Sequence, residues 1–96
     1  MDRNEVLETI ARLRPQLNQL AVCSLYLFGS VARGEADVSS DLDLLVEFDR
    51  PVGLFHFVRL RDFLSRELGI EVDLVTRDAL SAHVRDNVLG EAIRAA

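Results

Sequence analysis

The apolar residues of the first twenty positions recur at the spacing of one helical face. They follow one another at intervals of four and three residues, as Val6, Ile10, Leu13, Leu17 and Leu20. A period of 3.6 residues places such positions on a single side of a helix. Pro15 interrupts this ladder, because proline has no N–H to donate to the preceding turn. The pattern therefore predicts a kinked helix or two short helices before residue 23.

Three later stretches have the pattern of strands. Residues 23–28 are apolar and aromatic, which predicts a short buried strand. Residues 41–48 alternate, and an alternating strand points successive side chains to opposite faces. One face then carries Leu42, Leu44, Val46 and Phe48, and the other carries Asp41, Asp43, Leu45 and Glu47. Residues 70–75 repeat the alternation, with Asp73 on the side opposite Ile70, Val72 and Leu74.

Two further helices complete the predicted elements. Pro51 and Gly53 open a helix that should reach Leu68, with Gly69 as its C-cap. A final helical stretch is expected after Thr76 or Asp78. Its apolar residues are Leu80, Val84, Val88, Leu89 and Ile93. The order helix, strand, turn, strand, helix, strand, helix predicts an α/β (α+β) fold, in which helices cover the apolar face of a small three-stranded sheet.

Composition narrows the chemistry that this fold can carry. The chain has 96 residues and a net charge of −5, and all 11 of its basic residues are arginine. This length predicts a single domain over residues 1–96. The absence of lysine excludes a phosphate-binding lysine of the Walker type and a lysine nucleophile. The acidic balance argues against nucleic acid as a partner. No apolar run has the length of a membrane span, so we expect a soluble, cytoplasmic protein without a membrane partner.

The cysteine and the histidines add no second chemistry. Cys23 is the single cysteine, so it can form no internal disulfide, and its apolar surroundings predict a small core residue. His56 and His83 are not tied by spacing to Ser30 or Cys23. We therefore expect both histidines to be structural or surface residues.

The informative polar feature is the pair Asp41 and Asp43. Residues two apart on a strand point the same way, with Cα atoms roughly 6.5–7 Å apart, so these carboxylates repel each other. A divalent cation between them would remove the repulsion, and oxygen ligands favour Mg²⁺ or Mn²⁺. The alternative is a face that is simply solvated, as half-exposed strands often are.

Asp73 provides a third carboxylate. If both strands bury their aliphatic faces against the same helices, Asp73 joins Asp41 and Asp43 on the opposite face. Three carboxylates meet the needs of a two-metal site. An exposed strand position is the other interpretation of Asp73 until the two strands are shown to be neighbours.

The turn at Gly29 and Ser30 ends the first predicted strand. Glycine lets backbone amides approach a phosphate closely, serine adds a hydroxyl donor, and a short helix from Val31 would aim its N-terminus at the same point. Arg33 could neutralise charge on a triphosphate or pyrophosphate. Taken alone, however, a Gly-Ser pair most often marks an ordinary turn.

The combined motif is more specific than its parts. The runs GSVARG (residues 29–34) and SDLDLLV (residues 40–46), with Asp73 on a later strand, resemble the signature of the DNA polymerase β-type nucleotidyltransferase superfamily. The resemblance covers almost the entire chain. Within that superfamily the chain is similar to the minimal nucleotidyltransferases (MNT proteins), which are paired with HEPN-domain toxins as antitoxins.

The resemblance implies a fold, a reaction and a partner. The fold is a mixed sheet with flanking helices, and the reaction moves a nucleoside monophosphate from a triphosphate, with two Mg²⁺ ions as cofactors. In HEPN–MNT pairs it implies AMP transfer from ATP to a tyrosine hydroxyl of the toxin. The implied residues are the catalytic and metal-binding Asp41, Asp43 and Asp73 and the nucleotide-binding Gly29, Ser30 and Arg33. Asp73 would bind the metal that activates the acceptor and could take the acceptor's proton.

Two other functions stay open from the sequence. The first is a non-catalytic antitoxin that blocks its partner by contact, with a site that is inert or kept for nucleotide sensing. In either case a partner could dock on the apolar residues of the last helix or on Leu54 and Phe55, for which the other interpretation is ordinary core packing. The second is nucleotidyl transfer to a small molecule or an RNA end. The acidic balance disfavours this last function, as does the absence of residues left over for an accessory domain.

Overall fold

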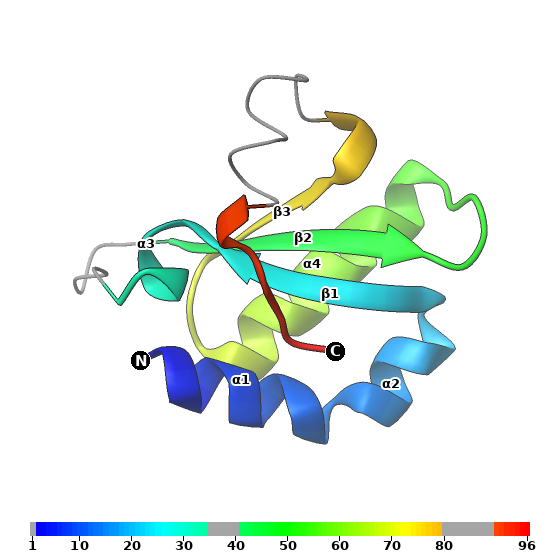
Figure 1. The fold of residues 1–96 in the computed structure, drawn as a ribbon. Helices are drawn as coiled ribbons and strands as arrows, with labels where there is room; N and C mark the ends of the chain where they lie inside the picture. Colours follow the sequence, from blue (N-terminus) through cyan, green and yellow to red (C-terminus); the bar gives the residue numbers. More distant parts are fainter. Residues whose placement is uncertain (1, 35–40, 80–89) are drawn as a thin grey trace.

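A computed structural model describes residues 2–34, 41–79 and 90–96. Its elements follow the chain in the order shown in Figure 1. They are α1 (Arg3–Arg12), α2 (Arg14–Gln19), β1 (Val22–Phe28), α3 (Gly29–Ala32), β2 (Leu42–Phe48), α4 (Leu54–Leu68), β3 (Val72–Thr76), the 3₁₀ turn η1 (Arg77–Ala79) and β4 (Ile93–Arg94). No helix in these ranges is long and apolar enough to cross a membrane.

The sheet is mixed, and its strand order is β3-β2-β1-β4. Strand β1 is antiparallel to both β2 and β4, whereas β2 and β3 are parallel. Parallel strands need a crossover connection, and α4 supplies it between β2 and β3. This crossover brings β3 beside β2, which decides where the aspartates lie.

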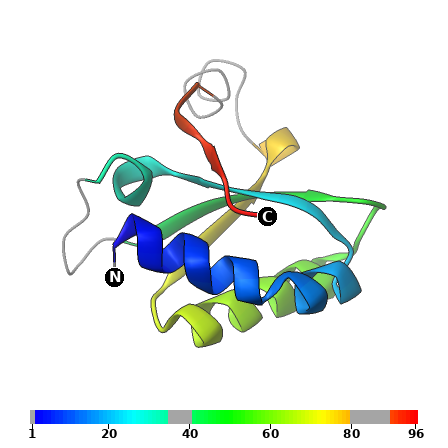
Figure 2. The ribbon, with the colours of Figure 1, turned by 60° about the horizontal axis from the view of Figure 1, so that its bottom comes forward.

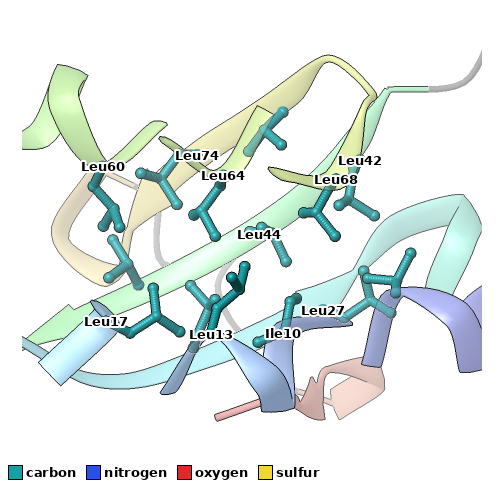
Figure 3. Packing of buried hydrophobic residues seen from close by; sticks show 14 of the residues in the cluster. Ile10, Leu13, Leu17, Leu27, Leu42, Leu44, Leu60, Leu64, Leu68 and Leu74 are labelled. Carbon is teal, nitrogen blue, oxygen red and sulfur yellow. The ribbon is translucent and has the colours of Figure 1, made fainter. Parts of the chain in front are cut away.

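Helices α1, α2 and α4 lie on one side of the sheet (Figure 2). Between them and the strands is a single cluster of buried aliphatic side chains, which Figure 3 shows from close by. Each helix and each of the three long strands contributes to it, with Ile10, Leu17, Leu27, Leu44, Leu64 and Leu74 among its members. The polar members of the alternating strands therefore face the other side of the sheet.

The N-terminal helix is divided, as Pro15 predicts. Helix α1 ends at Arg12, and Pro15 occupies the first turn of α2, where its missing N–H costs no hydrogen bond. Asp2 caps α1 by accepting the Glu5 N–H at 2.9 Å. The predicted C-cap of α4 is also confirmed, since Gly69 has the left-handed φ of 67° that favours glycine.

The sheet has four strands where the sequence predicted three. Ile93, which the periodicity assigned to a final helix, instead pairs with Leu27 as part of β4. A two-residue pairing with a distant strand leaves no local pattern in the sequence. The conformation of this segment is therefore determined by its hydrogen bonds to β1. Gly90 and Glu91, also within the predicted final helix, are helical, whereas residues 80–89, His83 among them, lie outside the described ranges.

Cys23 is exposed, and its prediction as a core residue is wrong. The pairing of β1 with β2 shifts between Val22 and Ser24, so Cys23 has no partner across the strand pair. Such an extra residue bends the strand and breaks the alternation on which burial is predicted. His56, by contrast, is structural as expected: its Nε2 contacts the carbonyl oxygen of Leu20, and its ring packs edge-on to Phe48.

Candidate active site

The central feature of the site is a pair of aspartates on neighbouring parallel strands. Asp43 of β2 and Asp73 of β3 are directly opposite each other in the register. Their neighbours Leu42, Leu44, Val72 and Leu74 are buried in the core. Because successive side chains alternate, both carboxylates lie on the face opposite the helices. The condition that the sequence left open, that the two strands be neighbours, is met.

This pairing puts like charges close together in a partly buried position. Burial raises the pKa of Asp43, and the nearby carboxylates of Asp73 and Asp41 raise it further. A hydrogen bond between the side chains of Asp43 and Asp73 acts in the same direction, while the Arg33 guanidinium lowers the pKa. The fold therefore holds several carboxylates close together at a partly buried position, where keeping them ionised costs free energy.

Gly29 brings the Gly-Ser turn against this pair. The first residue of α3 has a φ of 75°, and a Cβ there would overlap with Oδ2 of Asp43 and lie 3.0 Å from its Cγ. A side chain at position 29 would thus be excluded both by the backbone conformation and by the space. The two halves of the motif are separated along the chain, with Gly29 and Asp41 12 positions apart. In the fold these two halves contact each other.

The remaining predicted residues surround this contact. Ser30 follows Gly29 in α3 and is half-buried, and Asp41 is exposed just before the start of β2. Arg33 ends α3, with its backbone N–H donating to the Gly29 carbonyl oxygen at 3.2 Å. All six predicted residues lie within the described ranges. The four charged ones are near one another, because Asp41, Asp73 and Arg33 each influence the pKa of Asp43.

Glu91 is a neighbour that the sequence did not single out. Its carboxylate accepts hydrogen bonds from the Gly29 N–H and from Nη1 of Arg33. The only sequence signal was an acidic residue 58 positions from Arg33, which belongs to no motif. Strand β4 brings it to the site, and that pairing was itself not predicted.

The donor set fits a hard divalent cation that is shared with a ligand. Over residues 2–34, 41–79 and 90–96, no three His, Cys, Asp or Glu side chains are grouped to hold a metal ion. Mg²⁺ usually takes one or two carboxylates and completes its shell with water and substrate phosphates. Asp43 and Asp73 supply such a pair, and a cation there would neutralise the repulsion that raises the pKa of Asp43.

Comparison with known proteins agrees with this class of site. The family model of the nucleotidyltransferase domain matches residues 7–95. The protein adenylyltransferase MntA of Thermococcus cleftensis is 37% identical over 75 residues, which are 78% of this chain and 76% of that protein. The chain therefore belongs to the nucleotidyltransferase domain family, and it is an enzyme of the nucleotidyltransferase class.

Two solved structures have the same fold. One, described provisionally as a minimal nucleotidyltransferase, superposes with a TM-score of 0.85 at 38% identity and covers 97% of this chain and 95% of that chain. The other is the tri-AMPylated HEPN toxin of Shewanella oneidensis in complex with its MNT antitoxin, with a TM-score of 0.69 at 19% identity, covering 95% of this chain and 71% of that chain. The resemblance to the minimal nucleotidyltransferases is thereby confirmed, and so is the mixed α/β fold.

Proposed function

We propose that this chain transfers AMP from ATP to a tyrosine hydroxyl of a HEPN-domain partner and thereby acts as the partner's antitoxin. The observation that carries the proposal is the meeting of Asp43 with both Gly29 and Asp73. It joins a turn suited to phosphate with a carboxylate pair suited to a divalent cation. The name of the Thermococcus relative, a protein adenylyltransferase, supports a protein acceptor.

The proposed reaction exchanges one P–O bond for another. The acceptor oxygen attacks the α-phosphorus of ATP, the bond from that phosphorus to the bridging oxygen breaks, and pyrophosphate leaves. The acceptor's proton passes toward Asp73, which lies beside the reaction centre in this proposal. No protein nucleophile is required, so the absence of lysine is no obstacle.

Each predicted residue has a role in this scheme. The N–H groups of the turn, the Ser30 hydroxyl and the Arg33 guanidinium would bind the triphosphate oxygens, on which charge accumulates as pyrophosphate leaves. Asp41, Asp43 and Asp73 would hold two Mg²⁺ ions. When bound, these ions supply positive charge to the phosphate oxygens and lower the pKa of the acceptor hydroxyl.

The test is the intact mass of a HEPN protein encoded beside this chain, after incubation with the protein, ATP and Mg²⁺. We expect an increase by one or more adenylyl groups, and the Asp41→Asn and Asp43→Asn variants should abolish it. Asp62→Asn is the matched control, because Asp62 is an exposed residue of α4 that pairs with its neighbour Arg61. An unmodified partner that is still neutralised by Asp43→Asn would refute the proposal.

That last result would support the second candidate, an antitoxin that acts by contact alone. A specific observation favours it: Leu54 and Phe55, at the start of α4, are 73% and 87% exposed. Phe55 also borders a hollow of about 660 Å³ between α2 and α4, together with Leu20, Val58 and Phe63. Large apolar side chains exposed side by side are typical of contact surfaces. If the chain acts by contact alone, replacing Phe55 with serine should weaken neutralisation of the partner. If it acts as an adenylyltransferase, modification of the partner should depend on the aspartates.

A further inference from the structure

The carboxylate of Glu91 joins the two ends of α3. Its Oε1 accepts the Gly29 N–H at 3.3 Å and lies 3.1 Å from Nη1 of Arg33. Its Oε2 is 3.2 Å from the same arginine nitrogen. One side chain thus contacts the first residue of this four-residue helix and the residue that ends it.

The backbone that follows Glu91 is fixed by the sheet. Ile93 and Arg94 form β4 against β1. Beyond them, the N–H groups of Ala95 and Ala96 donate to the Leu25 carbonyl oxygen at 2.7 and 3.1 Å, and the Leu25 N–H donates back to Ala96 at 3.1 Å. Glu91 is two residues from this anchored segment, so its carboxylate reaches α3 from a defined direction.

Arg33 experiences a competing attraction. Its guanidinium lies close enough to Asp43 to influence that carboxylate, and Asp73 and Asp41 add negative charge at the same place. An arginine that moved onto these aspartates would neutralise them and withdraw from the Gly-Ser turn. The ion pair with Glu91 acts on the same guanidinium from the C-terminal segment.

Glu91 accepts a hydrogen bond from the first N–H group of α3. The first N–H groups of any helix have no partner within it. Glu91 accepts the first of them, that of Gly29, and the N–H groups of Ser30 and Val31 follow in the chain. In the proposed site the N–H groups of Ser30 and Val31 would serve the phosphate, while that of Gly29 stays with Glu91.

We propose that Glu91 is a positioning residue, which holds Arg33 and the Gly29 end of α3 in place for the triphosphate and acts mainly through Arg33. This inference rests on the proposed function, since it concerns the same nucleotide site. It assigns a role to the C-terminal segment: β4 extends the sheet and also delivers the side chain that orders the phosphate-binding turn.

The test is the Kd of ATP in the presence of Mg²⁺, measured by calorimetry on the purified chain without a partner. Glu91→Ala should raise the Kd about tenfold, and Glu91→Gln about threefold, because the amide oxygen keeps the geometry but loses the charge-assisted part of the contact. Glu47→Ala is the matched control. The Glu47–Arg77 pair is as exposed as the Glu91–Arg33 pair, with side chains 31% and 44% exposed against 33% and 44%.

The control variant should leave the Kd within about twofold, and all three variants should melt within about 3 °C of the parent protein, because exposed ion pairs contribute little stability. A double-mutant cycle then tests whether Glu91 acts through Arg33. In an Arg33→Ala background, Glu91→Ala should change the Kd by less than about twofold.

Three results would overturn the inference alone: ATP binding by Glu91→Ala with the parent's Kd, an equal effect of Glu91→Ala in both backgrounds, or tighter binding by Glu91→Ala. The last would show that Glu91 competes with the nucleotide. If the unaltered protein bound no nucleotide, the proposed function would fall together with this inference, so the two failures are distinguishable.

Discussion

At the scale of single residues, Asp43 shows how a site can be built at the expense of stability. Its neighbours on β2 are fully buried leucines, yet Asp43 itself is a carboxylate against Gly29 and opposite Asp73. Burial and two like charges raise its pKa, so ionisation is easier in the unfolded chain than in the folded one. The contribution of the Asp43 carboxyl to the free energy of unfolding is therefore largest at low pH, below the pKa that this group has in the unfolded chain. It is lost as the pH rises through the higher pKa that the group has in the folded protein.

We therefore predict that Asp43→Asn stabilises the metal-free protein at pH 7. The gain in the free energy of unfolding should be about 0.5 kcal/mol, a small value because the group is partly exposed and solvent screens its neighbours. That corresponds to a rise in Tm of about 2–4 °C in a domain of this size. The gain should vanish below about pH 4, where the aspartate is protonated in both states.

Thermal unfolding between pH 3 and pH 8, in the presence of a chelator, measures this effect. Asp62→Asn is again the control, and its Tm should follow that of the parent protein at every pH. A lower Tm for Asp43→Asn at pH 7 would contradict the prediction, because it would mean that the ionised carboxylate stabilises the fold.

At the scale of elements, α3 is a helix that exists only because of its contacts. Four residues are far too few for an isolated helix. Arg3 of α1 donates from Nη1 to the Ala32 carbonyl oxygen at 3.1 Å, and Glu91 accepts the Gly29 N–H at the other end. At the Gly29 end, the glycine lies against Asp43 of β2 with no room for a side chain.

Gly29→Ala should therefore break the contact between α3 and β2. The left-handed φ costs an alanine about 1 kcal/mol, and overlap with the Asp43 carboxylate adds about 1–2 kcal/mol. Gly34→Ala is a matched control, since Gly34 has a φ of 74° but no atom of the described residues lies within 4 Å of the position a Cβ would take. Urea unfolding should show the φ cost alone for Gly34→Ala and the larger loss for Gly29→Ala. Equal losses would show that the contact with Asp43 carries no weight.

The elements that the sequence predicted well are those with a period. The helical spacing before residue 23, the alternation around Asp43 and the glycine after Leu68 each have a local physical cause, and the structure agrees with all three. Strand β4 and the exposed Cys23 have no such cause. The first is a pairing with a distant strand and the second follows from a bulge, and both depend on tertiary register.

The candidate site divides in the same way. The strand alternation suffices to place Asp43 and Asp73 on the face opposite the helices. That the two strands are neighbours, with these aspartates opposite each other, comes from the structure. The contact of Gly29 with Asp43 and the ion pair of Glu91 with Arg33 could not be read from the chain. They arise from side chains whose separation in sequence says nothing of their distance in the fold.

At the scale of the whole molecule, charge makes nucleotide binding conditional. The chain carries a net charge of −5, and ATP adds about −4 when fully ionised. Among the described residues, Asp43 is influenced by the cation of Arg33 and by the carboxylates of Asp41 and Asp73, so the negative groups outnumber the positive one and repel a triphosphate that arrives without a metal ion. Two divalent ions would reverse the sign of the local field, which means that metal and nucleotide should bind together rather than independently.

We predict that ATP and Mg²⁺ stabilise the protein only in combination. At a nucleotide concentration 100-fold above its Kd, the pair should add about 2.7 kcal/mol to the free energy of unfolding, or on the order of 10 °C in Tm. ATP with a chelator should leave the Tm within about 1 °C of the apo value. The Asp41→Asn, Asp43→Asn double variant should lose the joint effect, whereas Asp62→Asn should keep it. A full shift by ATP in the chelator would contradict this coupling, because it would show that the protein's own donors suffice to hold the triphosphate.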